Sequence, residues 1–289
     1  MATATAPPTS PRMQVVNALL HGLRFYAKHA PFKRGRGLFI RVIEFLKRRG
    51  WPAPLTTIGD GLTMEFEPSL LGWTIFERGS WEPAQTALLL ECLHPGAVVL
   101  DVGANTGYYA LLAAAAVGAS GHVHAFEIQH PIIEILHRNV IRNGLQNIVS
   151  IIEAGCFSTE GTATIEGHGD PGSARIRFAA TGMHVPITTI DRYATAESLQ
   201  RVDLILIDAE GADFEILKGA SDILMRFHPL VMAEVNHLGT FGGTEQGMRA
   251  FMSQFGYSVR ALQSEFSGDL LFLPPNFHAR AGSVVTHAS

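Results

Sequence analysis

The run from Val98 to Gly107, VVLDVGANTG, is the sequence feature that most constrains the fold of this chain. Its apolar start is typical of a buried strand, and the glycines after Asp101 predict a turn followed by a helix. Gly103 and Gly107 allow the backbone to pass close to a ligand. Asp101 stands at the carboxyl end of the strand, where open α/β sheets bind ligands and where a pyrophosphate would be repelled. The run therefore predicts an α/β fold whose ligand offers hydroxyl or ammonium donors at this turn.

Strand-like and helix-like segments alternate from residue 97 onward. The predicted strands are 97–102, 122–126, 148–152, 203–207, 230–234, 257–261 and 269–273. The predicted helices are 107–117, 131–143, 213–227 and 244–255. The last two strands follow one another across a turn-like segment, which is typical of an antiparallel end to a parallel sheet. The pattern predicts a seven-stranded, mostly parallel sheet with an antiparallel last strand and helices on both faces.

Ligand-binding groups are also expected after the second and third strands. Glu127 follows the second strand, 20 residues after Gly107, and an acid there can accept both hydroxyls of a ribose. Glu153 and Ala154 follow the third strand. S-adenosylmethionine fits this set, because it offers a ribose, an α-amino group and a sulfonium. NAD is the competing ligand, but Asn105 stands where its Gly-x-Gly-x-x-Gly turn needs the second glycine.

Several separate motifs occur in an order that is similar to one family. They lie at 98–109, 125–127, 139–145, 185–191, 207–213 (IDAEGAD) and 217–220. On these motifs the chain resembles the FkbM family of class I methyltransferases over roughly residues 75–273. Two motifs depart from the usual family pattern. Ile128 replaces a proline, and within 208–213 Ala209 replaces a valine and Asp213 replaces a glutamate. The resemblance implies a Rossmann-like fold, S-adenosylmethionine as cofactor with S-adenosylhomocysteine as product, and O-methylation of a sugar, polyketide or similar metabolite or glycoconjugate.

The residues expected to contact the cofactor come from the four strand ends. They are Asp101, Gly103, Ala104, Asn105, Gly107, Tyr108, Glu127, Ile128, Glu153, Ala154 and Asp208. Two other functions stay open beside O-methylation. One is N-methylation of an amine-bearing metabolite, which needs a weaker base. The other is an inactive S-adenosylmethionine-binding regulator or scaffold, against which the intact Asp208 and Glu210 argue.

Polar clusters follow the fourth and fifth strands, where the methyl acceptor is expected. A hydroxyl nucleophile must lose its proton to a base or near a metal. We expect Asp208 and Glu210 to position the acceptor or the amino group of the cofactor, with His237 or Glu210 as the base. The alternatives are that His237 is a loop residue without a role and that Glu210 makes a structural contact.

A divalent metal is the second hypothesis for activating the nucleophile. Asp208, Glu234 and Asn236 supply the oxygen ligands that Mg²⁺ prefers, although the family resemblance does not require a metal. His122 and His124 share one face of the second strand and resemble a metal-binding pair in spacing. We interpret these histidines as structural, because they lie inside a central strand.

The predicted organisation has five parts. They are a disordered start (1–11), a basic helical extension (12–54), strands and a helix that cap the core (55–96), the methyltransferase domain with an insert at 156–190 (97–274), and a loose tail (275–289). Within the third part we expect strands at 55–66 and 73–76 and a helix at 82–93. The acceptor is expected among 66–82, 156–185 and 236–243. Aromatic residues there or nearby are Trp73, Phe76, Trp81, Tyr108 and Phe241.

Positive charge is concentrated at the start of the chain. Residues 1–50 hold ten of the 22 Lys and Arg residues but one of the 26 acids, so the remainder carries a net charge of −13. Such an arm favours an anionic membrane surface or a phosphate-bearing carrier lipid. It can equally dock on the acidic remainder of its own chain or of a partner subunit, which leaves a homodimer open. No nucleic-acid partner is expected, because the catalytic region is acidic.

The expected location is the cytoplasm, with membrane association through the basic arm as an option. Cys92 and Cys156 belong to different predicted elements and are interpreted as reduced thiols. The apolar stretches fall short of the roughly 20 residues of a membrane-spanning helix. Residues 1–11 lack the charged and apolar regions of a signal peptide.

Overall fold

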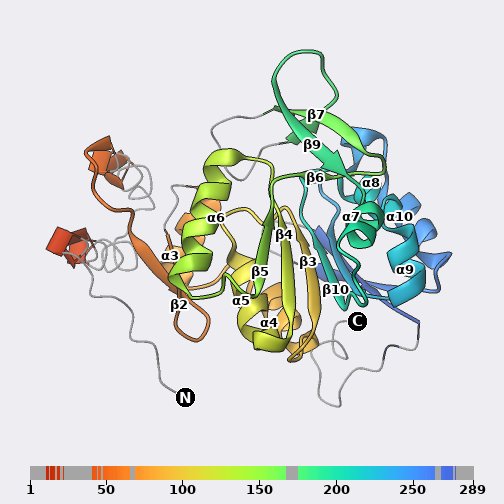
Figure 1. Cartoon of the computed structure of the whole chain (residues 1–289), viewed down its shortest axis with the longest axis horizontal. Coiled ribbons are helices and arrows are strands. Elements are labelled where there is room, and N and C mark those ends of the chain that lie inside the picture. Colours follow the sequence, from red (N-terminus) through yellow and green to blue (C-terminus); the bar gives the residue numbers. More distant parts are fainter. Residues whose placement is uncertain are drawn as a thin grey trace. The chain divides into compact units, whose positions relative to one another are not determined.

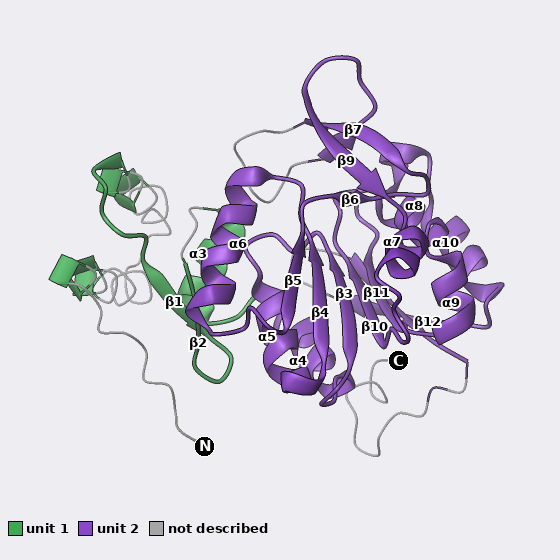
Figure 2. Cartoon of the chain, in the orientation of Figure 1, with its two compact units in different colours: residues 1–81 green, residues 82–289 purple. Residues whose placement is uncertain are grey.

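The computed structural model describes residues 11–12, 14–16, 18–19, 22, 41–43, 45–46, 48–65, 69–166, 175–263, 268–275 and 277. The chain forms two compact units, Met1–Trp81 and Glu82–Ser289 (Figure 2). Most of the predicted disordered start, basic extension and loose tail lies outside the described residues, as does the glycine-rich part of the insert. The predicted domain boundaries stay predictions.

The first unit contains a β-hairpin and a helix. Strands β1 (Leu55–Ile58) and β2 (Leu62–Glu65) lie in the segment 55–66 where strands were predicted, and they pair antiparallel. Helix α3 (Leu70–Arg78) covers residues 73–76, so the prediction of a strand there was wrong. The ends of the segment explain the difference: Ser69 Oγ accepts a hydrogen bond from the Gly72 amide, and Gly79 ends the helix in the left-handed conformation.

The second unit is built on a seven-stranded sheet (Figure 1). Its strands are β3 (Val98–Val102), β4 (His122–Phe126), β5 (Val149–Ile152), β10 (Leu204–Ile207), β11 (Leu230–Glu234), β12 (Ser258–Gln263) and β13 (Gly268–Leu273). Their order is β12-β13-β11-β10-β3-β4-β5. The pairs from β11 through β10, β3 and β4 to β5 are parallel, and β13 is antiparallel to both of its neighbours. The predicted sheet is therefore confirmed, including its antiparallel last strand.

Helices cover both faces of this sheet (Figure 1). They are α4 (Pro83–Cys92), α5 (Tyr108–Val117), α6 (His130–Arg142), α7 (Ile190–Ala196), α8 (Asp213–Lys218), α9 (Ser221–Phe227) and α10 (Glu245–Ser253), with short 3₁₀ turns η1 (Gly118–Ser120) and η2 (Leu238–Phe241). Leu100 and Val102 of β3 join one core with buried residues of α7, α9 and α10. The alternate residues of the strand, Val99 and Asp101, face the other way, where α5 packs on β3 and β4.

The helix predicted at 213–227 is divided into α8 and α9. The division falls at Gly219, where a Cβ atom would lie 2.2 Å from the backbone oxygen of Phe157. Because backbone from another segment passes this closely, no larger residue fits at this position. The periodicity of the sequence continues through the break and so conceals it.

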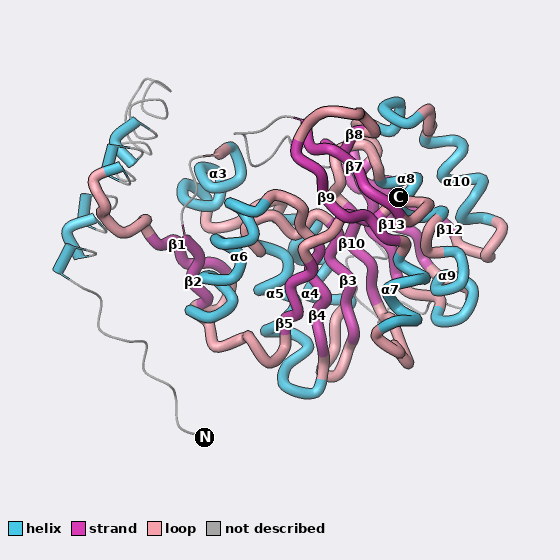
Figure 3. Tube along the Cα trace, turned by 45° about the horizontal axis from the view of Figure 1, so that its top comes forward, coloured by secondary structure: helices cyan, strands magenta, loops and turns pink. Residues whose placement is uncertain are grey.

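The insert forms a second sheet of its own. Strands β6 (Gly155–Cys156), β7 (Gly161–Glu166), β8 (Arg175–Arg177) and β9 (Met183–Thr188) pair in the order β6-β9-β7-β8. This sheet begins three residues after β5, beside the carboxyl ends of the parallel strands, and β8 lies at its edge (Figure 3). Its inward-facing residues join the main core, among them Ile165, Ile176 and Val185. The insert is therefore part of the second unit. None of the described helices has the length and apolarity that crossing a membrane requires.

Candidate active site

Four loops that carry predicted site residues meet at one edge of the main sheet. Strands β4, β3, β10 and β11 are parallel and in close register, with Val102 paired to Phe126 and to Ile207. Their carboxyl ends therefore bring the residues that follow them to the same edge. This common edge is what the sequence predicted for Asp101, Glu127, Asp208 and the residues near His237.

The glycine turn after β3 is held by close packing. The amides of Gly103 and Ala104 both donate to the backbone oxygen of Phe126, at 3.0 and 2.9 Å. Gly103 has a φ of 91°, and a Cβ there would lie 1.9 Å from the backbone oxygen of Asp208. Gly107 has a φ of 98°, and its Cβ would meet a methyl group of Leu136 at 2.5 Å. Both glycines thus have a packing role, and ligand contact at them stays a prediction.

Glu127 connects this turn to the end of β4. Its Oε2 accepts a hydrogen bond from the Asn105 amide at 3.0 Å, and its Oε1 accepts from the amides of Ile128 and Gln129 at 2.7 and 2.9 Å. Burial raises the pKa of Glu127, and the three amides oppose that shift. Each carboxylate oxygen can accept two hydrogen bonds, so Oε2 keeps acceptor capacity for a ligand hydroxyl.

Asp101 is a buried acid at this edge with an unpaired oxygen. It is 3% exposed, and its Oδ2 has no hydrogen-bond partner among the described residues. Burial, and after it the charge of Glu127, raises the pKa of Asp101 to about 7. A buried carboxylate oxygen without a donor is costly, so Asp101 fits a ligand that brings hydroxyl or ammonium donors.

The other predicted cofactor residues are placed differently. Tyr108 is buried, and its hydroxyl shares a hydrogen bond with Thr86 Oγ1 at 3.1 Å. Ile128 is half-buried against the main core. Ala154 is half-buried, whereas Glu153 is exposed, with its Oε2 3.9 Å from His130 Nδ1. A role for these four residues at the cofactor stays a prediction.

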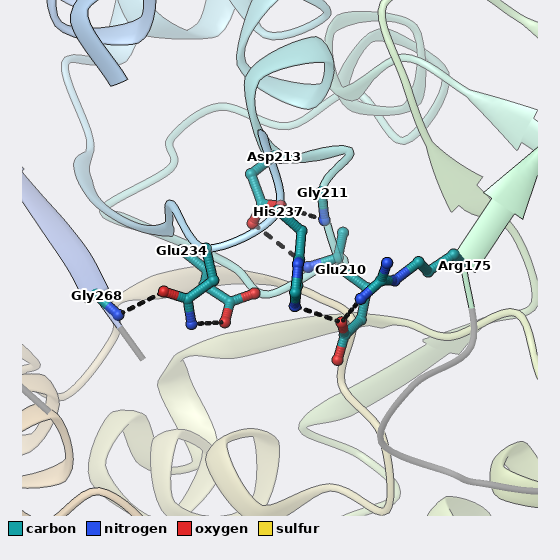
Figure 4. Close-up of polar contacts among 9 residues, drawn as sticks. Arg175, Glu210, Gly211, Asp213, Glu234, His237 and Gly268 are labelled. Atoms are coloured by element: carbon teal, nitrogen blue, oxygen red, sulfur yellow. Dashed lines mark hydrogen bonds and ion pairs between the residues drawn. The ribbon is translucent and has the colours of Figure 1, made fainter. Parts of the chain in front are cut away.

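Glu210 is the central residue of the candidate catalytic group (Figure 4). Its Oε2 lies 3.4 Å from Arg175 Nη2 and 3.7 Å from His237 Nε2. Glu210 has a φ of 51°, in the left-handed region that is strained for a residue with a Cβ. A Cβ on Gly211 would lie 2.5 Å from the backbone oxygen of His237, so the loops after β10 and β11 are in direct contact. The structure therefore brings the predicted Glu210 and His237 together.

Asp213 holds the loop that carries Glu210. Its Oδ2 accepts from the Gly211 amide at 3.0 Å and its Oδ1 from the Ala209 amide at 3.4 Å (Figure 4). The side chain is buried, and this burial raises the pKa of Asp213 to about 7. The carboxylate thus replaces backbone partners that the turn between β10 and α8 lacks.

Glu234 adds a further carboxylate at the end of β11. Its Oε1 accepts from Asn236 Nδ2 at 2.7 Å, and its Oε2 is buried without a partner among the described residues. Burial, then the charges of Asp213 and Glu210, raises the pKa of Glu234 to about 8. Asp208 is exposed at the edge. Its pKa is raised, first by desolvation from the protein around it and then by the charge of Glu234. Such a concentration of acids favours a cationic group.

Two of the predicted metal ligands, Glu234 and Asn236, are hydrogen-bonded to each other. Besides its bond to Glu234, Asn236 accepts a hydrogen bond from the Gly268 amide at 2.9 Å through Oδ1 (Figure 4). Within the described residues, no group of three or more His, Cys, Asp or Glu side chains is arranged to hold a metal ion. A metal held by Asp208, Glu234 and Asn236 stays a hypothesis, in which Asn236 would have to exchange its contacts with Glu234 and Gly268.

His122 and His124 have structural partners, in line with our interpretation of them. His122 Nε2 lies 2.8 Å from Ser150 Oγ, and His124 Nδ1 lies 2.8 Å from the Tyr193 hydroxyl. Burial, and then its neighbour His122, lowers the pKa of His124 to about 4. Both imidazoles thus join strand β4 to neighbouring side chains.

Sequence reasoning did not single out Arg175, Asp213 or the pair of Tyr109 and Glu82 near this edge. Arg175 comes from the insert, whose short strands gave no periodicity that would orient it. Asp213 stood inside a family motif but was read there only as a change of acid. Tyr109 donates to Glu82 Oε2 at 3.0 Å, which joins α5 to the first residue of the second unit. Two of the aromatic residues predicted for the acceptor are buried: Tyr108, and Phe76 in the small core of the first unit.

The sequence profile of the methyltransferase FkbM domain matches residues 101–259. This span is more than half of the chain and includes all four strand ends described above. The chain belongs to the FkbM methyltransferase family. The family resemblance that the motifs of the sequence carried is therefore confirmed.

Other similarities of this FkbM methyltransferase are more remote. The protein-L-isoaspartate O-methyltransferase of Thermotoga maritima is 36% identical over 80 residues, which are 27% of this chain and 25% of that protein. The protein-L-isoaspartate O-methyltransferase of Methanosarcina mazei is 26% identical over 112 residues, which are 38% of this chain and 43% of that protein. The chain thus spans less than half the length of these relatives. A crystal structure of an FkbM methyltransferase from Methylobacillus flagellatus is 14% identical, with a TM-score of 0.47, over 63% of this chain and 44% of that one. An O-methyltransferase from Bacillus cereus, in complex with SAH, is 14% identical with a TM-score of 0.43, over 91% and 100%.

Proposed function

We propose that this FkbM methyltransferase methylates a hydroxyl oxygen of a small metabolite or glycoconjugate. The observation that carries the proposal is the contact of Glu210 Oε2 with both His237 and Arg175 at the carboxyl ends of β10 and β11. A carboxylate beside an imidazole is a common arrangement for removing a proton. A hydroxyl acceptor needs such a base, whereas an amine acceptor needs a weaker one.

The cofactor fits the acids at the neighbouring strand ends. Asp101 Oδ2 and Glu127 Oε2 would accept hydrogen bonds from the ribose hydroxyls or the ammonium group, and Asp208 would face the positive charge of the cofactor. When bound, S-adenosylmethionine supplies an activated methyl group whose bond to sulfur breaks as the bond to oxygen forms. The protein then mainly aligns the acceptor and excludes water.

His237 and Glu210 would divide the work of deprotonation. With Nε2 of His237 directed to Glu210, Nδ1 of the ring is left to accept the hydroxyl proton, and Glu210 stabilises the imidazolium. Arg175 would hold the Glu210 carboxylate in place through its Nη2. In the alternative assignment Glu210 takes the proton directly and His237 only orients it.

The test is turnover by Glu210→Gln and His237→Ala. The protein is incubated with S-adenosylmethionine and a panel of hydroxylated and amine-bearing metabolites, and S-adenosylhomocysteine is measured. We expect each substitution to lower kcat by about 10²- to 10⁴-fold, with cofactor affinity by calorimetry unchanged. Glu134→Gln, which changes an exposed acid on α6, is the matched control.

Each outcome of this assay has a clear meaning. Wild-type turnover in both variants would remove the catalytic assignment. Methylation of amines but not of hydroxyls would replace the proposal by N-methylation. Cofactor binding without turnover on any acceptor would favour an inactive regulator or scaffold.

The basic arm, cytoplasmic location and homodimer stay proposals. Most of residues 12–49 lies outside the described residues. Co-sedimentation of the whole chain with anionic liposomes, compared with a chain lacking residues 1–50, tests the membrane contact. Equal co-sedimentation would remove it.

A further inference from the structure

An aromatic cluster lies near the candidate catalytic group and has no part in the chemistry described so far. It consists of Phe157, Phe178 and Phe241, whose ring centroids are separated by 5.0, 5.1 and 6.2 Å in edge-to-face arrangements. The three residues come from different segments: one follows β6, one follows β8 and one ends η2. Phe157 is buried and belongs to the main core, so it anchors the other two.

Phe178 is the unusual member of this cluster. It is 55% exposed although two aromatic rings contact it, while its neighbour Ile176 on β8 is buried. A large aromatic side chain held in place by other rings, yet open to solvent, presents a preformed apolar surface. Phe241 is half-buried beside it. The exposed parts of the Phe178 and Phe241 rings can therefore contact a further ring that belongs to a ligand.

Two segments connect this surface to the candidate catalytic group. The segment at β8 supplies Arg175 to Glu210 and, three residues later, Phe178 to the aromatic cluster. The segment at η2 supplies His237 and, four residues later, Phe241. Three extended residues span at most about 11 Å, and four residues of 3₁₀ helix span about 8 Å. A single two-ring molecule is long enough to reach from the base to the aromatic rings.

We propose that Phe178 and Phe241 bind an aromatic or flat apolar ring that the methyl acceptor carries next to the methylated hydroxyl. The acceptor is then a hydroxyl compound with an aryl substituent, of which an aryl glycoside is the simplest form. The inference rests on the proposed function, because it places the hydroxyl of that molecule at His237. It extends that function by assigning a class of acceptor and two residues that select it.

The probe is 4-methylumbelliferyl β-glucoside, a fluorescent aryl glycoside, and binding is followed by fluorescence polarisation. Methyl β-glucoside, which has the same sugar without the aryl ring, serves as a competitor. We expect Phe178→Ala and Phe241→Ala each to weaken probe binding about two- to tenfold, which is the range of one aromatic contact. The matched control is Ile141→Ala on α6, which removes another exposed apolar side chain.

The outcomes separate this inference from the proposed function. Binding by the wild type that both phenylalanine variants weaken, and that methyl glucoside fails to displace, supports the aryl site. No binding by the wild type, or equal affinity in Phe178→Ala and Ile141→Ala, overturns it. If the probe binds in this way but hydroxyl compounds are never methylated, the aryl site stands and the proposed chemistry fails.

Discussion

Replacing Asp101 by asparagine should stabilise the cofactor-free protein, although the residue stands in the most characteristic motif of the chain. The pKa of Asp101 is about 7 in the folded protein and 3.8 in its ordinary state, chiefly because the side chain is buried. Between these two values the folded protein keeps a proton that the unfolded chain releases. Stability therefore falls as the pH rises through this window. At 1.36 kcal/mol for each pKa unit, ionised Asp101 costs the folded state roughly 4 kcal/mol above pH 7.

Asparagine has nearly the same shape and does not ionise, so it avoids this cost. The assay is urea unfolding of the wild type and Asp101→Asn at pH 5 and pH 8. The advantage of the variant should grow by roughly 3 kcal/mol between the two pH values. Exposed Glu153→Gln, which lies at the same edge, should show no such growth.

The same substitution should act in the opposite direction on the cofactor. Loss of a charged acceptor is expected to weaken S-adenosylmethionine binding at pH 8 by about ten- to a hundredfold, measured by calorimetry. The reasoning is refuted if Asp101→Asn is no more stable than the wild type at pH 8. It is also refuted if the stability difference is the same at both pH values.

Three further predictions concern the turn, a helix contact and metal dependence. Gly103→Ala should lower the free energy of unfolding by more than about 3 kcal/mol, because its Cβ meets backbone at 1.9 Å. Gly107→Ala should lower the free energy of unfolding by less, since its Cβ meets a side chain. Gly144→Ala, with open space and a φ of 68°, should cost only the backbone strain of about 1–2 kcal/mol. Urea unfolding of the three variants gives this order, and equal losses of stability would contradict it. Tyr109→Phe should cost about 1–2 kcal/mol, because it removes the donor to Glu82; an unchanged urea midpoint would contradict this. Treatment with EDTA should leave methyl transfer intact, and activity that is lost and then restored by Mg²⁺ would revive the metal hypothesis.

Features that depend on a few neighbouring residues could be predicted from the sequence. The apolar strands, the turn after Asp101 and the acid after β4 each have a local pattern, and the parallel order follows from their alternation with helices. The strand predicted at 73–76 was wrong because a capping serine and a glycine outweighed the β-like composition of four residues. The break at Gly219 was missed because its cause, the backbone of Phe157, is distant in sequence.

The candidate site was predictable in part for the same reason. Glu210 and His237 follow strands whose ends meet, so their proximity follows from the topology. Arg175 could not be placed, because the register of β8 against β7 is decided by pairing within the insert rather than by any local motif. Phe178, which directly follows the same strand, lies in the predicted acceptor region 156–185 but was not singled out for that reason too.

The distribution of unsatisfied groups connects the fold to its function. Among the described residues, five buried side-chain atoms lack a hydrogen-bond partner, and three of them belong to Asp101, Glu234 and Arg175 at the candidate active site. The other two belong to Thr56 of β1 and Arg260 of β12. A buried polar side chain away from the site can be paired within the protein, as when Asn139 donates to the backbone oxygen of Thr106 at 2.8 Å. Packing does not explain this difference, because an uncharged residue would stabilise the same positions. A ligand that brings its own donors and acceptors does explain it, and the stability lost in the empty protein would then be recovered on binding.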